Sequence, residues 1–416
     1  MQATATDPEA GPNSSDVDSS CESPLRSKHT ASLAEVLNAL GSSLLVSTYQ
    51  AGKLIFLRAE RDRLNTHFRP FNKPMGIAVG RNRIAIGGAL DIWEFHNVPA
   101  AASQAEGERA ADSCFLPRHS TVTGDIQIHE MEWGRKPNSV SVDSLPGRAV
   151  SSADSELWFV NTRFSCLCTR SDQYSFVPRW RPPFISTYTP EDRCHLNGLA
   201  MEGGVPRFVT ALGESDAPAG WRENKASGGI VMDVPSSEVI ARGLSMPHSP
   251  RLYGGQLWVL NSGQGGLGFI DSGTGKYQEV CRLPGFTRGL SFHGRYAFVG
   301  LSQVRESAYF SGIEISEVPE HERWSGVAVV DIVAGECIAW LRFEGAVQEV
   351  FAVSVLPDQQ WPDLINEDRD CIANAFVLPD DSLQAVPAGW RDTSGHAEPP
   401  LQSAPNTLLR HNQANA

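Results

Sequence analysis

The sequence lacks the long apolar segments and the clustered positive charge that mark membrane-spanning and nucleic-acid-binding proteins. No apolar run reaches the roughly 18 residues that a transmembrane helix needs. Lys and Arg number 35 against 48 Asp and Glu, which gives a net charge of −13. Because duplex nucleic acids and anionic membranes both bind through clustered basic residues, we expect neither as a partner.

Cysteine is also sparse, and the sequence has no CxxC pair that could form a zinc knuckle. Only Cys166 and Cys168 lie close together in the chain. The N-terminal stretch MQATATDPEAGPNSSDVDSS is acidic and polar, whereas a secretion signal is basic and then apolar. The sequence therefore predicts free structural thiols and a cytoplasmic location.

Helical periodicity is nearly absent from the sequence. Between residues 42 and 378 the chain consists of short β-branched and aromatic runs that Gly, Asn, Asp and Pro interrupt, which is the pattern of an all-β domain. A short helix is expected at Leu33–Leu40. Residues 1–30 and 380–416 are polar, so we predict a disordered acidic tail and a flexible polar tail on either side of one domain at 31–379.

One motif recurs through this domain: a strand of small and apolar residues, a tight turn, and a second strand that ends in small polar residues. The first strands of the six copies are Met75–Val79, His129–Trp133, Asn197–Met201, His248–Leu252, Arg288–Phe292 and Glu349–Val353. A second strand follows five of them, but none is evident after Glu349–Val353. The repeat predicts six similar blades, the last of which is incomplete.

The N-terminal segment supplies the missing part of the sixth blade. Leu44–Tyr49 resembles the second strands Leu157–Thr162 and Leu257–Ser262, and Lys53–Leu57 follows it as a hairpin partner. Such a clasp removes the exposed edges of the first and last blades. We therefore predict an all-β, six-bladed β-propeller whose last blade combines N-terminal strands with Glu349–Val353. A β-sandwich, the alternative all-β fold, gives short strands without this phased repeat or complementary ends.

The first residues of the six inner strands are expected to surround one mouth of the central channel. Five of these residues are polar: His129, Asn197, His248, Arg288 and Glu349. His195, two residues before Asn197, is expected to point to the same side of its strand. Three interpretations stay open: the polar lining of a water-filled channel, a divalent-metal site, or a pocket for an anionic or polar ligand centred on Arg288.

In the metal interpretation the ligands are three histidines, His129, His195 and His248. Imidazole ligands favour zinc, iron, copper or manganese over calcium. Such a metal would act as a Lewis acid or activate water for hydrolytic or oxidative chemistry. Glu349 would then be a fourth ligand or a general base, and Arg288 or Arg163 would hold an anionic group of the substrate.

Strand ends and loops at the same mouth supply further candidates for ligand binding. They are Asn161, Asn197, Asn261, Gln303, Trp180 and Arg305. Asn161 and Asn261 also have an ordinary explanation, because Asn favours turns at strand ends. The insertions at 178–194, 213–227 and 303–325 carry aromatic and Arg side chains, a composition typical of binding interfaces. A non-catalytic scaffold that binds a protein through these loops is therefore the alternative.

Two resemblances add to this interpretation. Asn197-Gly-Leu-Ala200 resembles a segment of the calcium-dependent lactonase and strictosidine-synthase-like six-bladed propellers, in which the equivalent Asn and a Glu help to hold a divalent metal. Asn197 and Glu349 match that oxygen set. His129 and His248 stand where oxygen ligands are expected, which argues against calcium and lactonase chemistry.

More of the chain resembles a group of uncharacterised bacterial hypothetical propeller proteins. The matching stretches are Ser47–Lys53, Leu157–Leu167, His195–Ala200, Pro247–Arg251 and Leu257–Gly263. The resemblance implies the propeller fold and a bacterial cytoplasmic setting, and it implies no particular activity. We therefore expect a small polar molecule as the ligand, bound by a metal enzyme or by a non-catalytic site, with a protein partner as the alternative.

Overall fold

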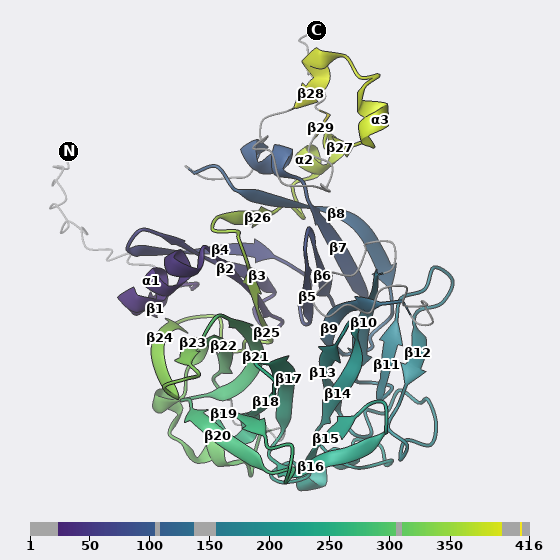
Figure 1. Ribbon diagram of the computed structural model, residues 1–416, viewed down its shortest axis with the longest axis vertical. Coiled ribbons are helices and arrows are strands. Elements are labelled where there is room, and N and C mark those ends of the chain that lie inside the picture. The colour runs from purple at the N-terminus through teal and green to yellow at the C-terminus, as the bar shows by residue number, and fades with distance from the viewer. Residues whose placement is uncertain (1–23, 105–108, 137–154, 305–309, 393–407, 410–416) are drawn as a thin grey trace, which may run out of the picture.

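Six blade-like sheets surround one axis in the computed structural model, which describes residues 24–104, 109–136, 155–304, 310–392 and 408–409 (Figure 1). Each blade has four antiparallel strands, and two blades carry one extra strand at the outer edge. The prediction of an all-β, six-bladed β-propeller is confirmed.

Within each blade the strands follow one another from the axis outward. Blade one consists of β5 (Ile77–Gly80), β6 (Arg83–Gly87), β7 (Asp91–Asn97) and β8 (Ser113–Val122). Blade two consists of β9 (Ile128–Arg135), β10 (Ser155–Asn161), β11 (Cys166–Thr169) and β12 (Val177–Trp180). Blade three consists of β13 (Leu196–Glu202), β14 (Val205–Ala211), β15 (Gly229–Asp233) and β16 (Glu238–Leu244). Blades four and five consist of β17 (Pro247–Tyr253), β18 (Gln256–Asn261), β19 (Gly266–Ile270) and β20 (Tyr277–Arg282); and β21 (Phe286–His293), β22 (Tyr296–Ser302), β23 (Ser325–Asp331) and β24 (Glu336–Phe343).

Blade six is built from both ends of the domain. Its inner strand β25 (Ala352–Leu356) pairs with β2 (Ser43–Thr48), and β3 (Lys53–Glu60) and β4 (Arg63–Pro70) complete the sheet. The predicted clasp is confirmed, but the inner strand begins three residues later than Glu349. The reason lies at Val350, whose N–H and C=O bond with the Ser302 hydroxyl of blade five at 3.0 and 3.1 Å.

Some residues that the sequence assigns to the tails form regular structure. Ser27–His29 (β1) pairs with β24 at the edge of blade five, because backbone pairing does not require apolar side chains. The helix α1 (Ala31–Leu40) follows and ends at Gly41, whose φ of 60° is left-handed. Within the described residues, no helix has both the length and the apolar character that crossing a membrane requires.

The C-terminal region adds short elements beyond the sixth blade. They are β26 (Pro362–Leu364), α2 (Arg369–Ala373), β27 (Phe376–Val377), α3 (Asp380–Leu383), β28 (Arg391–Asp392) and β29 (Leu408–Leu409). The last three strands form a small sheet of their own, at the top of Figure 1. Of these elements, α3, β28 and β29 lie within the predicted tail at 380–416.

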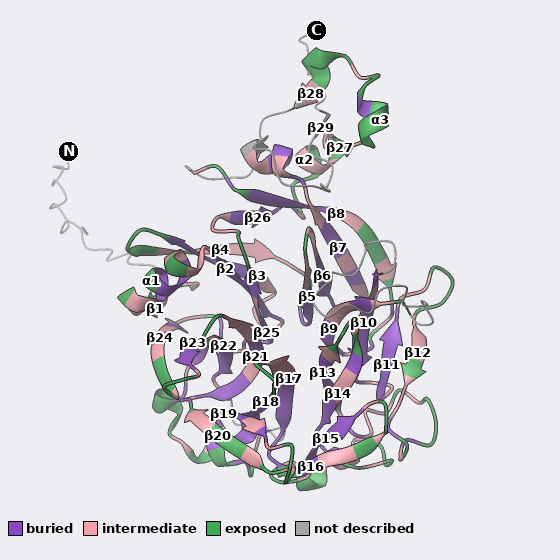
Figure 2. Ribbon diagram, in the orientation of Figure 1, coloured by how far each residue is buried: buried purple, intermediate pink, exposed green. Residues whose placement is uncertain are grey.

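The hydrophobic core lies between neighbouring blades, whose inner and middle strands are largely buried (Figure 2). One apolar cluster joins Phe56 of blade six, Phe95 of blade one and Phe159 of blade two. Another joins Leu196 of blade three with Val160 of blade two. Packing between blades therefore holds the ring together and leaves the inner-strand ends free to carry polar groups.

A second device closes the ring beside the clasp. The strand β26 pairs in parallel with β8 of blade one, while the Asp363 side chain bonds with two residues of blade six. Its carboxylate lies 3.0 Å from His67 Nε2 and 2.8 Å from Arg69 Nη2. Burial would raise the pKa of Asp363, but the hydrogen bonds from His67 and Arg69 outweigh it and bring the pKa to about 2. We call this arrangement the latch.

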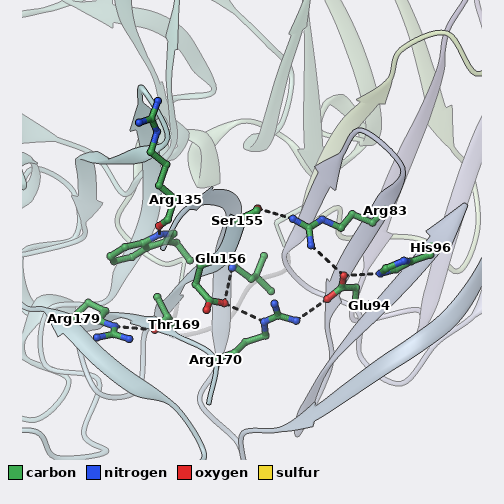
Figure 3. Close-up of polar contacts among 11 residues, drawn as sticks. Arg83, Glu94, His96, Arg135, Ser155, Glu156, Thr169, Arg170 and Arg179 are labelled. Atoms are coloured by element: carbon green, nitrogen blue, oxygen red, sulfur yellow. Dashed lines mark hydrogen bonds and ion pairs between the residues drawn. The ribbon is translucent and has the colours of Figure 1, made fainter. Parts of the chain in front are cut away.

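A buried polar network joins blades one and two (Figure 3). The Glu94 carboxylate accepts from His96 Nε2 at 2.8 Å, from Arg170 Nη1 at 2.6 Å and from Arg83 Nη1 at 3.4 Å. Arg83 also donates to Ser155 Oγ at 2.6 Å. Burial would raise the pKa of Glu94, but the bond to His96 and the charges of Arg170 and Arg83 bring it to about 2.

This network predicts an acid-dependent stability. Because the folded pKa of Glu94 lies below its ordinary value of 4.5, the unfolded chain binds more protons between these values. The stabilisation, about 3 kcal/mol, is present above about pH 5 and is lost as the pH falls through about 2. Glu94→Gln should therefore lower the free energy of unfolding clearly at pH 7 and by roughly half as much at pH 3, as measured by urea titration. Glu238→Gln, an exposed carboxylate, is the control. If the difference in free energy of unfolding between the wild type and Glu94→Gln did not become smaller in acid, the stabilising role of the Glu94 carboxylate would be contradicted.

Candidate functional site at the mouth of the propeller

The candidate site is the end of the axis at which the inner strands begin, which we call the mouth. In four successive blades the inner strand carries one extra residue near its start. These bulges lie between Ile128 and Met131, Leu196 and Gly198, His248 and Arg251, and Thr287 and Leu290. A β-bulge re-aims the side chains beside it, so the four blades present polar residues at the mouth through the same backbone device.

Left-handed backbone precedes three of these bulges. Gln127, His195 and Met246 have φ values of 50°, 51° and 47°. Each stands two residues before the strand position that was predicted to face the mouth. Left-handed backbone is energetically unfavourable for residues other than Gly, and it persists only where the surrounding structure holds it. Two of the three residues, Gln127 and Met246, use their carbonyl groups to orient a histidine.

His129 is buried at the mouth with one ring nitrogen anchored and the other unpaired. Its Nδ1 lies 2.8 Å from the carbonyl oxygen of Gln127 and 2.7 Å from Thr162 Oγ1. Because a carbonyl oxygen only accepts, Nδ1 carries the proton. Nε2 is buried and has no hydrogen-bond partner among the described residues. Burial lowers the pKa of His129 well below its ordinary value, and Arg288 and His195 lower it further, so the ring is neutral.

His248 repeats this arrangement two blades away. Its Nδ1 lies 2.9 Å from the carbonyl oxygen of Met246 and 3.0 Å from Ser262 Oγ. Burial lowers the pKa of His248 well below its ordinary value, and Arg288 contributes again. Thr162 and Ser262 each directly follow the second strand of their blade. The repeat therefore builds the same anchored, neutral imidazole twice.

His195 is anchored by a carboxylate instead of a carbonyl group. Its Nδ1 lies 2.8 Å from Asp192 Oδ2, which also accepts from Trp221 Nε1 at 3.1 Å. The Trp221 ring lies 4.6 Å from the His195 ring, and the His129 ring lies 5.0 Å away on an edge. Trp221 belongs to the insertion at 213–227, so this loop packs onto the mouth and fixes one of its histidines.

Arg288 reaches the mouth from blade five and is half-buried. Its guanidinium carbon lies 3.6 Å above the centre of the Phe351 ring. It makes no hydrogen bond or ion pair with any residue that the structure describes. Burial lowers the pKa of Arg288, while Tyr49 and Glu349 raise it. The Arg288 guanidinium is charged at neutral pH, because the ordinary pKa of a guanidinium lies far above neutral pH.

Glu349 lies near Arg288 and is engaged by blade six. The Tyr49 hydroxyl donates a hydrogen bond to Glu349 Oε2. The Tyr49 ring also contacts Phe351 edge to face, with centroids 5.6 Å apart. The clasp strand therefore ends at the mouth and positions the carboxylate that was predicted as a general base.

Below these residues an ion pair links the inner strands of three blades. Arg251 binds both carboxylate oxygens of Glu130, at 2.6 and 3.1 Å, and donates to the carbonyl oxygen of Leu199 at 3.3 Å. Glu132 lies on the same inner strand. Burial raises the pKa of Glu132 to about 7, although the charge of Arg251 opposes this rise. The pair stands one position deeper along β9 than His129.

The three predicted asparagines have bonds within the fold. Asn197 accepts from Thr210 Oγ1 at 2.7 Å and donates to the carbonyl oxygen of Pro247 at 3.0 Å, so both ends of this amide bond within the fold. Asn161 Oδ1 accepts from the backbone N–H of Phe164 at 3.0 Å, and Asn261 Oδ1 accepts from that of Ser245 at 2.7 Å. Both follow the strand-end role that Asn ordinarily has.

Three other predicted site residues, Arg163, Trp180 and Gln303, have side chains that bond with groups other than the three histidines. Arg163 pairs with Asp125 at 2.7 Å on the surface. Trp180, on the outermost strand of blade two, donates to Ser237 Oγ at 3.1 Å, and Gln303 Nε2 donates to the carbonyl oxygen of Glu320 at 3.2 Å. Arg305 lies outside the described residues.

The three histidines predicted as metal ligands are only partly brought together. His129 and His195 are ring neighbours, and no ring contact joins either of them to His248. Over the described ranges, no three His, Cys, Asp or Glu side chains gather as metal ligands. Metal-bound histidines nevertheless commonly donate a hydrogen bond from their other ring nitrogen to a carbonyl or carboxylate group, as Nδ1 does here. The metal site therefore stays a prediction.

Sequence reasoning missed Asp192, Thr162 and Phe351 as parts of the site. Phe351 stands two residues after Glu349, so period-two alternation could have placed it on the same side. Thr162 and Ser262 each follow an Asn at equivalent positions of the repeat, which was a usable signal. Asp192 lies in an insertion, and no repeat position indicates it.

The sheet topology and the polar mouth define a six-bladed β-propeller with a ring of anchored histidines. The chain belongs to the family described as a domain of unknown function, DUF4915, whose family model matches residues 31–365. The prediction of an uncharacterised propeller family is confirmed. A search of curated proteins gave no match.

Solved structures similar to this chain include propeller-like proteins of low sequence identity. A nidogen–laminin complex matches with 10% identity and a TM-score of 0.47, covering 76% of this chain and 99% of that chain. A protein of unknown function from Bacteroides caccae matches with 8% identity and a TM-score of 0.45, covering 76% and 98%. A catalytically inactive virginiamycin B lyase from Staphylococcus aureus, with quinupristin, matches with 8% identity and a TM-score of 0.37, covering 77% and 99%. None of these likenesses assigns a function to this chain.

Proposed function

We propose that the protein binds a small anionic molecule at the mouth of the propeller and that Arg288 holds the anion. The observation that carries this proposal is the guanidinium of Arg288, which is half-buried on Phe351 and unpaired among the described residues. Charges withdrawn from water are ordinarily paired. A carboxylate or phosphate would complete the arrangement by accepting two parallel hydrogen bonds from the guanidinium.

The electrostatic surroundings favour an anion over a divalent cation. Arg288 lowers the pKa of both His129 and His248, so its positive potential extends to both rings. The same potential opposes a divalent cation held between these imidazoles. The His-ligated metal enzyme, hydrolytic or oxidative, stays the second form of the hypothesis, because anchored neutral imidazoles are competent ligands.

The protein-interaction scaffold receives less support from the aromatic loops. Trp221 in the insertion at 213–227 is only 2% exposed and packs against His195, whereas Tyr188 in the insertion at 178–194 is 46% exposed and lies against Arg181. A docking surface for another protein would instead present such side chains to solvent. The insertion at 213–227 supports a histidine at the mouth, which suits a small ligand.

The proposal is tested by thermal unfolding and calorimetry of the intact protein with small carboxylates, phosphates and sulfonates, each beside its uncharged analogue. We expect one anion class to bind and to raise the melting temperature, since a ligand at 100 times its Kd adds about 2.7 kcal/mol. The metal content of protein purified without chelators and without a His-tag is measured in parallel. Stabilisation by zinc or manganese alone, or by no small molecule, would contradict the proposal.

A further inference from the structure

We infer that the anion bound at the mouth carries hydroxyl groups, because the structure assigns His129 and His248 as a pair of hydrogen-bond acceptors on either side of blade three. The ligand class is a hydroxylated carboxylate such as a polyhydroxy acid. This inference rests on the proposed function, since Arg288 supplies the contact to the carboxylate, and it adds what the rest of the ligand must offer.

The tautomer of both rings is fixed by their partners. Nδ1 of His129 and Nδ1 of His248 each contact a backbone carbonyl oxygen, at 2.8 and 2.9 Å. A carbonyl oxygen cannot donate, so each Nδ1 must carry the ring proton. In a neutral imidazole the other nitrogen is then a pure acceptor.

The neighbouring hydroxyl supports the same assignment at His129. Thr162 Oγ1 donates to the carbonyl oxygen of Leu196 at 2.6 Å, so its remaining lone pairs are free to accept from His129 Nδ1 at 2.7 Å. Every polar group around Nδ1 of His129 therefore accepts from it. The ring is held in one protonation pattern by groups of blades two and three and by Gln127 in the connection before β9.

Neither acceptor nitrogen has a hydrogen-bond partner in the part of the chain that the structure describes. Nε2 of His129 is buried and unpaired, and no residue that the structure describes bonds to Nε2 of His248. A buried acceptor left unpaired is costly, and native structures satisfy such groups with water or a ligand. His129 itself is only 6% exposed and His248 only 4%. Their Nε2 atoms are therefore accessible to water or a small molecule and not to a larger partner.

The groups that satisfy these nitrogens must be donors, and hydroxyls fit better than ammonium groups. Arg288 acts on both rings with a positive potential, as argued above. An ammonium group between the same rings would be repelled by that potential, whereas a neutral hydroxyl is not. The structure thus favours a molecule with an anionic group that contacts Arg288 and with uncharged hydrogen-bond donors that contact the two histidines.

Four six-carbon probes separate these requirements by calorimetric titration of the intact protein at pH 7.5. Gluconate has the carboxylate and the hydroxyls, hexanoate only the carboxylate, sorbitol only the hydroxyls, and 6-aminohexanoate an ammonium group in their place. Glycerate and propionate repeat the comparison at three carbons. We expect the hydroxy acid to bind about 100-fold more tightly than its deoxy analogue, about tenfold for each histidine contact.

The outcomes separate this inference from the proposed function. Equal affinity for hydroxy and deoxy acids, or tighter binding of 6-aminohexanoate, overturns the hydroxyl requirement and leaves the anion site standing. Binding of sorbitol without any acid, or of no probe at all, overturns both. His248→Phe should weaken gluconate about tenfold and leave hexanoate unchanged; the wild-type comparison decides the question if this variant does not fold.

Discussion

Replacement of Arg288 by Met should abolish measurable binding of the anionic ligand, weakening it at least about thirtyfold, or about 2 kcal/mol. The reason is that Arg288 is the cation at the mouth that no described residue pairs with, so a bound carboxylate loses its charge-assisted hydrogen bonds. Calorimetric titration with the best anion from the screen measures the loss. Arg288→Lys should retain part of the affinity, because Lys keeps the charge and loses the planar fork.

The same variant should fold at least as stably as the wild type. Arg288 contributes a stack on Phe351 but no hydrogen bond among the described residues, and removing a half-buried unpaired charge relieves a cost. Arg242→Met, at an exposed arginine paired with Glu214, is the matched control and should leave binding unchanged. A strong loss of stability in Arg288→Met with unchanged binding would show that Arg288 has a structural role instead.

Replacement of Asp363 by Ala should destabilise the propeller by about 3 to 5 kcal/mol, because it removes the buried carboxylate that pairs with His67 and Arg69. Asp363 is completely buried. In the same strand, the carbonyl oxygen of Pro362 accepts a hydrogen bond from Arg58 Nη1 at 3.0 Å. The latch joins blades six and one at their outer edge. Urea unfolding measures the loss, and hydrogen exchange should show faster exchange in β4 and β8 than in blades three and four.

Glu367→Ala is the matched control for the latch, because this exposed carboxylate follows the same strand. It should change the free energy of unfolding by less than about 0.5 kcal/mol. The stabilisation by Asp363 should also fade in acid: its pKa of about 2 lies below the ordinary value of 3.8, so the contribution is present above about pH 5 and lost as the pH falls through about 2. Uniform exchange around the ring would argue that the clasp alone closes it.

The fold was predictable because a propeller repeats. Six copies of one strand pair, together with an N-terminal Leu44–Tyr49 that matches the second strands, required a ring closed by both chain ends. The sequence could not predict β1 or β26. Both add to a blade edge through backbone pairing, and backbone hydrogen bonds leave little trace in side-chain periodicity.

The candidate site was predictable only where it follows the repeat. His129, His248 and Arg288 occupy equivalent inner-strand positions, and each lies within a bulge near the start of its strand. Asn197 occupies the same position but joins blade three to blade four instead. The sequence cannot distinguish these roles, because they depend on Thr210 and Pro247, which stand 13 and 50 residues away along the chain.

The anchoring partners were the hardest part of the site to predict. A carbonyl group carries no side-chain identity, so nothing in the sequence marks Gln127 or Met246 as the residue that orients a histidine. Their left-handed backbone arises from the bulged strand starts. Asp192 lies in an insertion with no counterpart in the other blades, so its contact with His195 becomes visible only in three dimensions.

The most direct test of the central claim is a bromide soak of crystals of the protein, with the anion located by anomalous diffraction. Bromide is a monovalent anion that needs no knowledge of the natural ligand. The account predicts a bromide ion in contact with the Arg288 guanidinium at the mouth, and its absence from crystals of Arg288→Met. Bromide ions found only on the outer surface, with the Arg288 guanidinium paired to another group of the protein, would contradict it.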